Sequence, residues 1–187
     1  MKHFCRFMSL IVPLLALFMT GCSVPPTSDI ERAQKAMDQA KAQNADLFAP
    51  EEWSAAEASW KEAQERIDAK NYSQAIPKLL KAQQGYQKAR DVAQGRKEAE
   101  VATIKGDQKA AELRYNTLKE NIAAAKRLSA ARKKELEDIG QSVEGSIAKV
   151  TTLLDQGSYN EAKALASSTL REVYEAEQKL KGYLGGK

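Results

Sequence analysis

Apolar residues recur at alternating spacings of three and four along most of this chain, which is the period of one face of an α-helix. The pattern is clearest in residues 50–93. A first apolar stripe there consists of Trp53, Ala56, Trp60, Ala63 and Ile67. A second stripe consists of Ala75, Leu79, Ala82, Tyr86, Ala89 and Ala93. The two stripes predict two helices that fold back on each other around a short turn at residues 69–73.

Residues with known capping preferences mark the starts of these two helices. Pro50 suits the first position of a helix, where a missing N–H costs nothing, and Glu51 and Glu52 place negative charge near the positive end of the helix dipole. For the second helix, Asn71 or Ser73 can accept a hydrogen bond from a free N–H of the first turn. The start of each helix of the hairpin is therefore well defined.

An earlier segment, residues 29–46, has the same helical period. Its stripe consists of Ile30, Ala33, Met37, Ala40, Asn44 and Leu47. Ser28, with Glu31 three residues later, forms the pattern of a capping box. We therefore expect a first helix from Asp29 to about Asp46, capped by Ser28.

The second half of the chain repeats this plan when Tyr72 is placed on Tyr159, since residues 71–75 then match residues 158–162 in polarity. One predicted helix has the stripe Ala111, Tyr115, Leu118, Ile122 and Ala125. The next has Leu136, Ile139, Val143, Ile147, Val150 and Leu154, and Ser129 is its expected cap. The last has Ala162, Ala166, Thr169, Val173, Ala176 and Leu180. This similarity predicts an internal duplication.

The predicted fold class is therefore all-α: antiparallel helical hairpins or a bundle, made of two related three-helix halves. The corners at Tyr72 and Tyr159 resemble those of tetratricopeptide-type repeats, but the rest of that motif is missing. The expected units are residues 29–94 and 109–181, joined by a hinge or frayed helical connector at 95–108 and followed by a flexible, glycine-rich tail at 182–187. Whether the halves pack side by side or extend as a rod stays open.

The aromatic residues of the stripes are expected to pack the core. Alanine is the most frequent residue of the apolar stripes and buries little surface area. Larger side chains must therefore supply most of the apolar contact between helices. The expected packing residues are Trp53, Trp60, Tyr72, Tyr86 and Tyr159. The alternative is that Trp53 and Trp60 hold a sugar or a hydrophobic peptide, but their spacing is that of core positions.

The N-terminal residues have the pattern of an export signal. Lys2 and Arg6 precede an apolar stretch that is shorter than the roughly 20 residues of a membrane span. Residues 19–22, Met-Thr-Gly-Cys, resemble the lipobox of bacterial lipoproteins, although leucine is more usual at the position of Met19. The resemblance implies that residues 1–21 are a signal peptide, that Cys22 carries lipid, and that residues 22–28 form a short tether. Ser23 after the cysteine implies the outer membrane in an enterobacterial host, while other hosts sort differently.

Removal of the signal peptide would leave few chemical groups for catalysis. His3 and Cys5 lie in the removed segment, and Cys22 would carry lipid, so the mature chain has no histidine or free thiol. These residues are the usual acid–base groups, nucleophiles and zinc ligands, so we expect no enzyme, metal or cofactor. The loss of Lys2 and Arg6 leaves a net charge of about +2, which gives no reason to expect a nucleic acid partner.

Residues 29–93 resemble a family of alanine-rich bacterial lipoproteins catalogued as domain of unknown function 4398. The matching features are Ala49-Pro50-Glu51-Glu52 and the Asn71-Tyr72 corner. Some members of that family precede OmpA-like peptidoglycan-binding domains, which implies a role in the cell envelope.

The last residue is a second link to the envelope. A lipidated cysteine, a helical body and a terminal lysine are also the layout of the major murein lipoprotein, whose lysine is joined to peptidoglycan. Lys187 is thus a candidate attachment point, although the long heptad pattern of that protein is absent.

Together these features predict a non-enzymatic, outer-membrane-anchored lipoprotein on the periplasmic face that acts as a helical scaffold or spacer. Its expected partners are the membrane through the lipid, an envelope protein or peptidoglycan, and a second copy of itself. One alternative is a periplasmic adaptor that binds a partner in a groove between the two halves. Another is an enzyme that uses carboxylates alone, such as a lytic glycosidase, but the acidic residues lie on outward faces.

Overall fold

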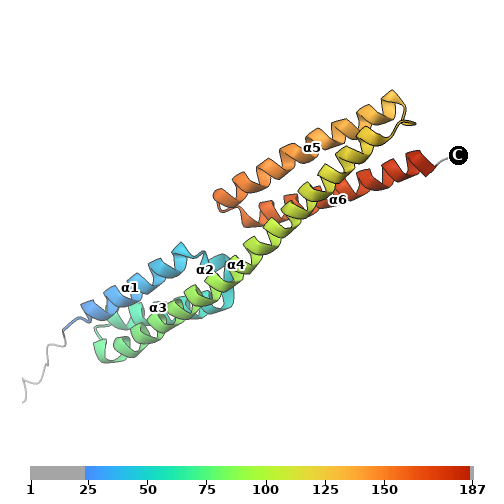
Figure 1. Ribbon diagram of the computed structural model, residues 1–187. Coiled ribbons are helices and arrows are strands. Elements are labelled where there is room, and N and C mark those ends of the chain that lie inside the picture. Colours follow the sequence, from blue (N-terminus) through green and yellow to red (C-terminus); the bar gives the residue numbers. More distant parts are fainter. Residues whose placement is uncertain (1–23, 186–187) are drawn as a thin grey trace, which may run out of the picture. The chain divides into compact units, whose positions relative to one another are not determined.

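The computed structural model describes residues 24–185, and that range contains helices and no strand. The helices are α1 (Thr27–Ala42), α2 (Ala45–Phe48), α3 (Pro50–Asp68), α4 (Tyr72–Ala124), α5 (Ala130–Asp155) and α6 (Tyr159–Gly185), shown in Figure 1. The all-α prediction is confirmed. The chain divides after Gln94 into two compact units, which we call unit 1 and unit 2, and α4 contributes residues to both.

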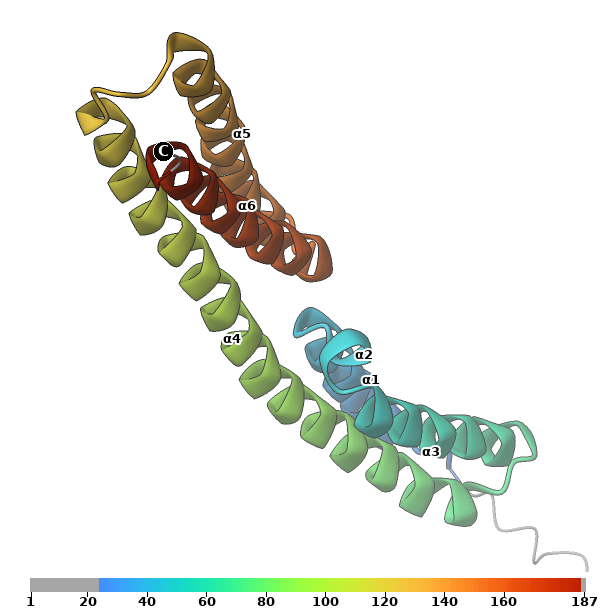
Figure 2. The same cartoon turned by 90° about the vertical axis from the view of Figure 1, so that its right-hand side faces the viewer.

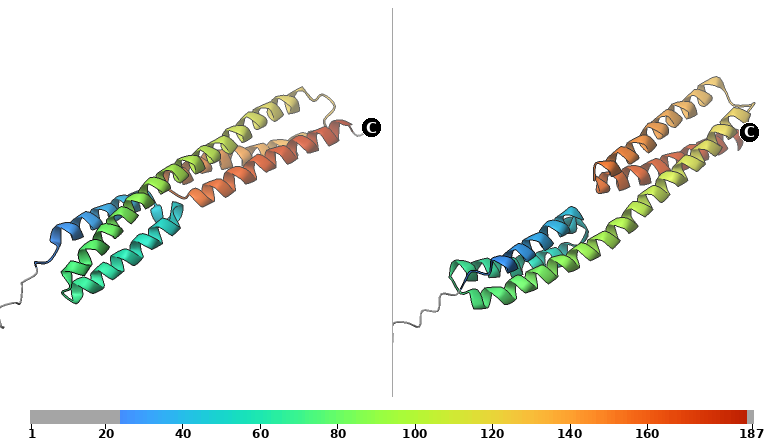
Figure 3. Two further views of the ribbon diagram at one scale, coloured as in Figure 1. Left: turned by 90° about the horizontal axis from the view of Figure 1, so that it is seen from below. Right: turned by 60° about the vertical axis from the view of Figure 1, so that its left-hand side comes forward.

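Unit 1 is built from α1, α2, α3 and the first part of α4, which lie alongside one another in all views (Figures 1 and 3). The two predicted stripes of the hairpin face inward. Seven of their members are completely buried, namely Ala63, Ala75, Leu79, Ala82, Tyr86, Ala89 and Ala93. The helical hairpin predicted for residues 50–93 is therefore present, with alanine at most close contacts.

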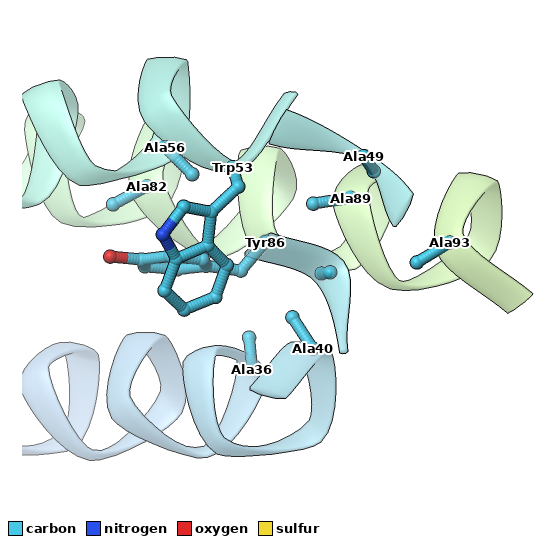
Figure 4. Packing of buried hydrophobic residues seen from close by; sticks show 10 residues of the cluster. Ala36, Ala40, Ala49, Trp53, Ala56, Ala82, Tyr86, Ala89 and Ala93 are labelled. Carbon is cyan, nitrogen blue, oxygen red and sulfur yellow. The ribbon is translucent and has the colours of Figure 1, made fainter. Parts of the chain in front are cut away.

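Two aromatic rings fill the space that these alanines leave. Trp53 on α3 and Tyr86 on α4 have ring centroids 5.1 Å apart and planes tilted by 56°. Figure 4 shows both rings lying between Ala36 and Ala40 of α1 and the alanines of α3 and α4. Tilted aromatic pairs at this separation stabilise a core beyond the area they bury. Trp53 and Tyr86 therefore form the centre of unit 1.

The first helix differs from the prediction at both ends. α1 begins at Thr27 after Pro26, and Ser28 lies inside its first turn without a capping hydrogen bond, so the predicted capping box is wrong. α1 ends at Ala42 because Asn44 takes a left-handed conformation with φ 58°. The short helix α2 then turns Ala45 inward and leaves Leu47 43% exposed, so Leu47 is not a core residue.

Unit 2 is built from the later part of α4 together with α5 and α6, which lie next to each other in Figure 2. Every member of the predicted stripe of α6 is buried: Ala162, Ala166, Thr169, Val173, Ala176 and Leu180. On α4, the predicted residues Ala111, Tyr115, Leu118 and Ile122 are buried too. On α5 the pattern shifts at the end, where Leu153 is buried and Leu154 only half-buried.

Of the two alternatives for residues 95–108, the structure has the helical connector, because these residues lie within α4. They also belong to unit 2, where Ile104 is fully buried in a cluster with Val150 and Ala166. The expected tail at residues 182–187 is corrected. Helix α6 continues to Gly185, so residues 182–185 are not a flexible tail. Gly182 lies on the exposed side of that helix, where it needs no special conformation, and Tyr183 packs against the core.

The turns that join α3 to α4 and α5 to α6 have the same backbone structure. Lys70 and Gly157 occupy equivalent positions, and both have a left-handed backbone, with φ 56° and 75°. The Lys70 N–H donates to the carbonyl of Ile67 at 2.8 Å, and the Gly157 N–H donates to that of Leu154 at 3.1 Å. Both hydrogen bonds therefore close the C-terminal end of a helix, α3 and α5 respectively, in the same manner.

The next residue of each turn makes a matching bond. The Asn71 N–H donates to the Arg66 carbonyl at 2.8 Å, and the Ser158 N–H donates to the Leu153 carbonyl at 2.9 Å. This is the hydrogen-bond pair of the Schellman motif. The similarity of residues 71–75 and 158–162 therefore extends to the backbone of the preceding helix ends, which supports a duplication of this hairpin.

Candidate functional site

The two residues predicted to carry covalent attachments, Cys22 and Lys187, lie outside the described residues. The described chain begins at Val24, whose side chain is 81% exposed. Two residues later Pro26 is buried, and α1 starts at Thr27. The chain thus enters the fold within a few residues of Cys22.

The predicted packing role of the two tryptophans agrees with their burial. Trp53 is 8% exposed, and Trp60 is half-buried and packs against both apolar clusters of unit 1. Tyr72 and Tyr159, at the two corners, are also half-buried, and the Lys97 ammonium lies 5.7 Å from the centroid of the Tyr159 ring. The tryptophans therefore belong to the core and do not form an open aromatic surface for a sugar.

The core of unit 1 contains a polar group without a partner. The Tyr86 side chain is completely buried, and its hydroxyl has no hydrogen-bond partner in the described part of the chain. Burial, with a smaller contribution from the Glu57 carboxylate, raises the pKa of Tyr86 to about 12. The phenol therefore stays neutral across the physiological range and does not serve as an acid or base there.

A concave site lies in unit 2, where the C-terminal ends of α4 and α6 meet the α4–α5 loop. We call it the C-terminal pocket; it measures about 620 Å³. It is lined by Leu118, Asn121, Ala124, Ala125, Lys126, Arg127, Glu177, Leu180, Lys181 and Leu184. Leu118 and Leu180 are buried at its base, while Leu184 is 52% exposed at its edge.

The charges around this pocket are mostly positive and unpaired. Its one carboxylate, on Glu177, accepts a hydrogen bond from Arg114 at 3.0 Å. The side chains of Lys126, Arg127 and Lys181 have no ion pair or hydrogen bond with any residue in the range 24–185. Lys126 and Arg127 follow the end of α4 at Ala124, where a positive charge suits the negative end of the helix dipole, and Lys181 lies near the end of α6.

Two smaller pockets of unit 2 have balanced charges. One, of about 370 Å³, is bordered by the ion pairs Lys119–Glu144, at 3.1 Å, and Lys133–Glu137, at 3.8 Å. The Glu144 carboxylate raises the pKa of Lys119, and the Lys119 ammonium lowers that of Glu144. The other, of about 290 Å³, lies near the α5–α6 corner. Neither has the excess of cations that the C-terminal pocket has.

A cluster of polar contacts joins the start of α5 to the end of α6. The Lys179 ammonium and the Tyr183 hydroxyl each donate to a different oxygen of Glu135, both at 2.7 Å. These bonds lower the pKa of Glu135, with Lys179 the larger cause. The Arg132 guanidinium lies 4.6 Å from the centroid of the Tyr183 ring. Arg132, Glu135 and Lys179 are exposed and Tyr183 is half-buried, so the cluster connects the end of α6 to the start of α5 at the protein surface.

The sequence alone does not reveal the C-terminal pocket, because it predicts a flexible tail at residues 182–187 and does not show which helix ends lie side by side. One signal was present: Lys126-Arg127 and Lys181 place three cations near apolar residues at the ends of two predicted helices. That signal becomes a site only when α4 and α6 are known to end side by side.

The described residues contain no group of three histidine, cysteine, aspartate or glutamate side chains placed to hold a metal ion. None of the helices between residues 24 and 185 has the length and apolar character needed to cross a membrane. Comparison of the chain with family models, with curated proteins and with solved structures found no match. The function is therefore inferred from the residues themselves.

Proposed function

We propose that this protein is a bacterial lipoprotein, anchored in the outer membrane through Cys22, whose helical body acts as a non-enzymatic scaffold or spacer in the periplasm. The observation that carries the proposal is the short distance along the chain from the lipobox to the fold. Only residues 23–26 separate Cys22 from the start of α1. Four extended residues span at most about 14 Å, so the helical body begins next to the lipid surface.

The character of the helical body supports a structural role. Its buried positions are mainly alanine, which lets helices pack closely, and lysine, arginine and glutamate side chains at its surface form ion pairs between neighbouring helices. The resemblance of residues 29–93 to alanine-rich lipoproteins, some of which precede peptidoglycan-binding domains, supports the same envelope role.

The anchor is tested with the full chain carrying Cys22→Ala, expressed in a bacterial host and labelled with a radioactive fatty acid. We expect loss of the label and release of the protein from the membrane fraction. Cys5→Ala is the matched control, because the same substitution in the signal peptide should leave both properties unchanged. Retention of label and of membrane association by Cys22→Ala would end the lipoprotein proposal.

The spacer role is tested by lysine crosslinking in cells, followed by capture of the protein and analysis of isolated peptidoglycan. Recovery with peptidoglycan, or as crosslinks between copies, agrees with a structural spacer. A single recurrent protein partner would instead favour the adaptor alternative. Deletion of Lys187 shows whether any recovery with peptidoglycan depends on that residue.

A further inference from the structure

We infer that the C-terminal pocket of unit 2 binds a single-chain amphiphile with an anionic head group. The inference rests on the shape of the pocket, its apolar base and its unpaired cations. It concerns unit 2 alone and does not depend on the proposed lipid on Cys22.

The base of the pocket suits an aliphatic chain. Leu118 and Leu180, which are almost completely buried, form part of it, and Ala124 and Ala125 add small apolar surfaces. At about 620 Å³ its size lies within the range of roughly 300–1,000 Å³ that is usual for small-molecule sites. An aliphatic chain that lies against the exposed side chain of Leu184 at the edge removes that side chain from water, and this favours binding.

The edge of the pocket suits a negative head group. Lys126, Arg127 and Lys181 supply three positive charges without partners in residues 24–185. The C-terminal ends of α4 and α6 together contribute roughly one negative charge, at about half a charge per helix end. Glu177 is already paired with Arg114. The dipoles therefore neutralise only part of the positive charge, and the remainder favours an anion.

The combination of the two features selects the class of ligand. A short anionic peptide, such as a fragment of a peptidoglycan stem, would satisfy the cations but has no long chain to cover the apolar base. A neutral or cationic amphiphile would cover the base and leave the cations unpaired. The neighbouring pocket at Lys119 and Glu144 has its charges paired internally, so the same argument gives no anion site there.

The test is isothermal titration calorimetry of a purified chain that begins at residue 23. All described helices lie within residues 27–185, so this chain retains both units, and circular dichroism verifies its helicity. The probes are dodecyl phosphate and dodecanoate, both below their micelle-forming concentrations, which distinguish phosphate from carboxylate heads. Dodecyltrimethylammonium, inorganic phosphate and a short peptide of alanine and glutamate are the comparison ligands. We expect saturable binding of one of the two anionic amphiphiles, at least tenfold tighter than any comparison ligand.

Two pairs of variants locate the binding. The triple variant Lys126→Gln, Arg127→Gln, Lys181→Gln should weaken binding at least tenfold. The control triple variant Lys109→Gln, Lys134→Gln, Lys149→Gln removes three exposed lysines of unit 2 outside the pocket and should leave binding unchanged. Likewise Leu184→Asp should weaken binding, whereas Leu113→Asp, at a leucine that is 59% exposed elsewhere on unit 2, should not.

The inference is overturned if the two triple variants bind equally well, or if the cationic amphiphile binds as tightly as the anionic ones. Binding of the peptide or of inorganic phosphate as tight as that of the amphiphiles would also overturn it, because the apolar base would then have no role.

Discussion

Units 1 and 2 have buried residues at equivalent positions, but the side chains at those positions differ. In the register that places Tyr72 on Tyr159, the buried positions of α4 in unit 1 coincide one by one with those of α6 in unit 2. The pairs are Ala75 with Ala162, Leu79 with Ala166, Ala82 with Thr169, Tyr86 with Val173, Ala89 with Ala176 and Ala93 with Leu180. The pattern of inward positions is therefore the common feature, and the volume at each position is not.

The largest difference lies at the centre of each core. In unit 1, α3 contributes the Trp53 ring, which packs on Tyr86 of α4. The position equivalent to Trp53 in unit 2 is Gly140, and there the ring comes from α4: a Cβ added at Gly140 would lie 2.5 Å from the Tyr115 hydroxyl oxygen. Both units bury an aromatic ring at the same level and take it from different helices. At a given height along such a core, the total side-chain volume matters more than which helix supplies it. A ring on one helix can fill the space that a glycine leaves on its neighbour.

A second difference lies at the edge of the cores. In unit 1 Phe48 and Val92 are apolar and pack against the buried cluster. The equivalent residues of unit 2 are Glu135 and Lys179, whose charged groups pair at 2.7 Å. These two positions thus hold either apolar side chains that pack on the core or an ion pair, because they lie where the core meets water.

The largest effect is expected from Trp53→Ala, which removes one of the two aromatic rings at the centre of unit 1. Loss of a buried tryptophan should lower the free energy of unfolding by about 3–5 kcal/mol. Chemical denaturation measures that loss, and amide hydrogen exchange should show lower protection mainly in residues 27–94. The exposed Leu113→Ala is the control and should change stability by less than about 0.5 kcal/mol. A loss below about 1 kcal/mol for Trp53→Ala would show that this ring is not the centre of unit 1.

A smaller effect is expected at the close contact of unit 2. Gly140→Ala forces its new methyl group against Tyr115 and should cost about 1–3 kcal/mol. Gly145→Ala is the matched control on the same helix, because nothing lies within 4 Å of its added Cβ. That change should stabilise unit 2 by up to about 1 kcal/mol through helix propensity. The melting temperatures of both variants test this prediction. Equal changes in melting temperature would contradict the tight packing of Tyr115 on Gly140.

Exchanging the left-handed residues of the two corners, Lys70 and Gly157, should change stability in opposite directions. Lys70 has a left-handed backbone that costs an L-residue roughly 1–2 kcal/mol, so Lys70→Gly should stabilise the protein by about 1 kcal/mol. Gly157→Lys, the reverse exchange at the equivalent corner, should destabilise it by a similar amount. Denaturation curves of both single variants test this pair. If both substitutions destabilise, the two corners are not equivalent in solution.

The smallest effect concerns pH and the edge ion pair. The pKa of Glu135 is held below its ordinary value of 4.5 by Lys179 and Tyr183, so the folded state favours the charged carboxylate. The resulting stability is present above that ordinary value and is lost as the pH falls from about 4.5 through the lowered pKa. The melting temperature should fall less over this range in Glu135→Gln than in the unchanged chain. Equal slopes would show that the pair contributes nothing measurable, as happens for many surface ion pairs.

The sequence predicted the hairpin of residues 50–93 and the stripe of α6 well, because both depend on helical period and on strong local signals. Pro50 starts α3, and Asn71 accepts a hydrogen bond from the Gln74 N–H at the start of α4. Ser129 likewise accepts one from the Arg132 N–H at the start of α5, as predicted. The predictions were less accurate where competing residues had similar local preferences. Ser28 had the capping pattern, yet α1 starts at Thr27 after Pro26, and Asn44 ended the helix by adopting a left-handed backbone.

The sequence by itself determined that this chain is helical, which positions face inward, and the lipobox that motivates the proposed anchor at Cys22, since each of these depends on spacing between nearby residues. Only the tertiary structure decided that Ile104 belongs to the core of unit 2, that Tyr115 covers Gly140, and that three cations surround an apolar pocket. The physical reason is that period fixes the direction of a side chain from its own helix, whereas the partner it meets depends on how far apart and at what level neighbouring helices pack.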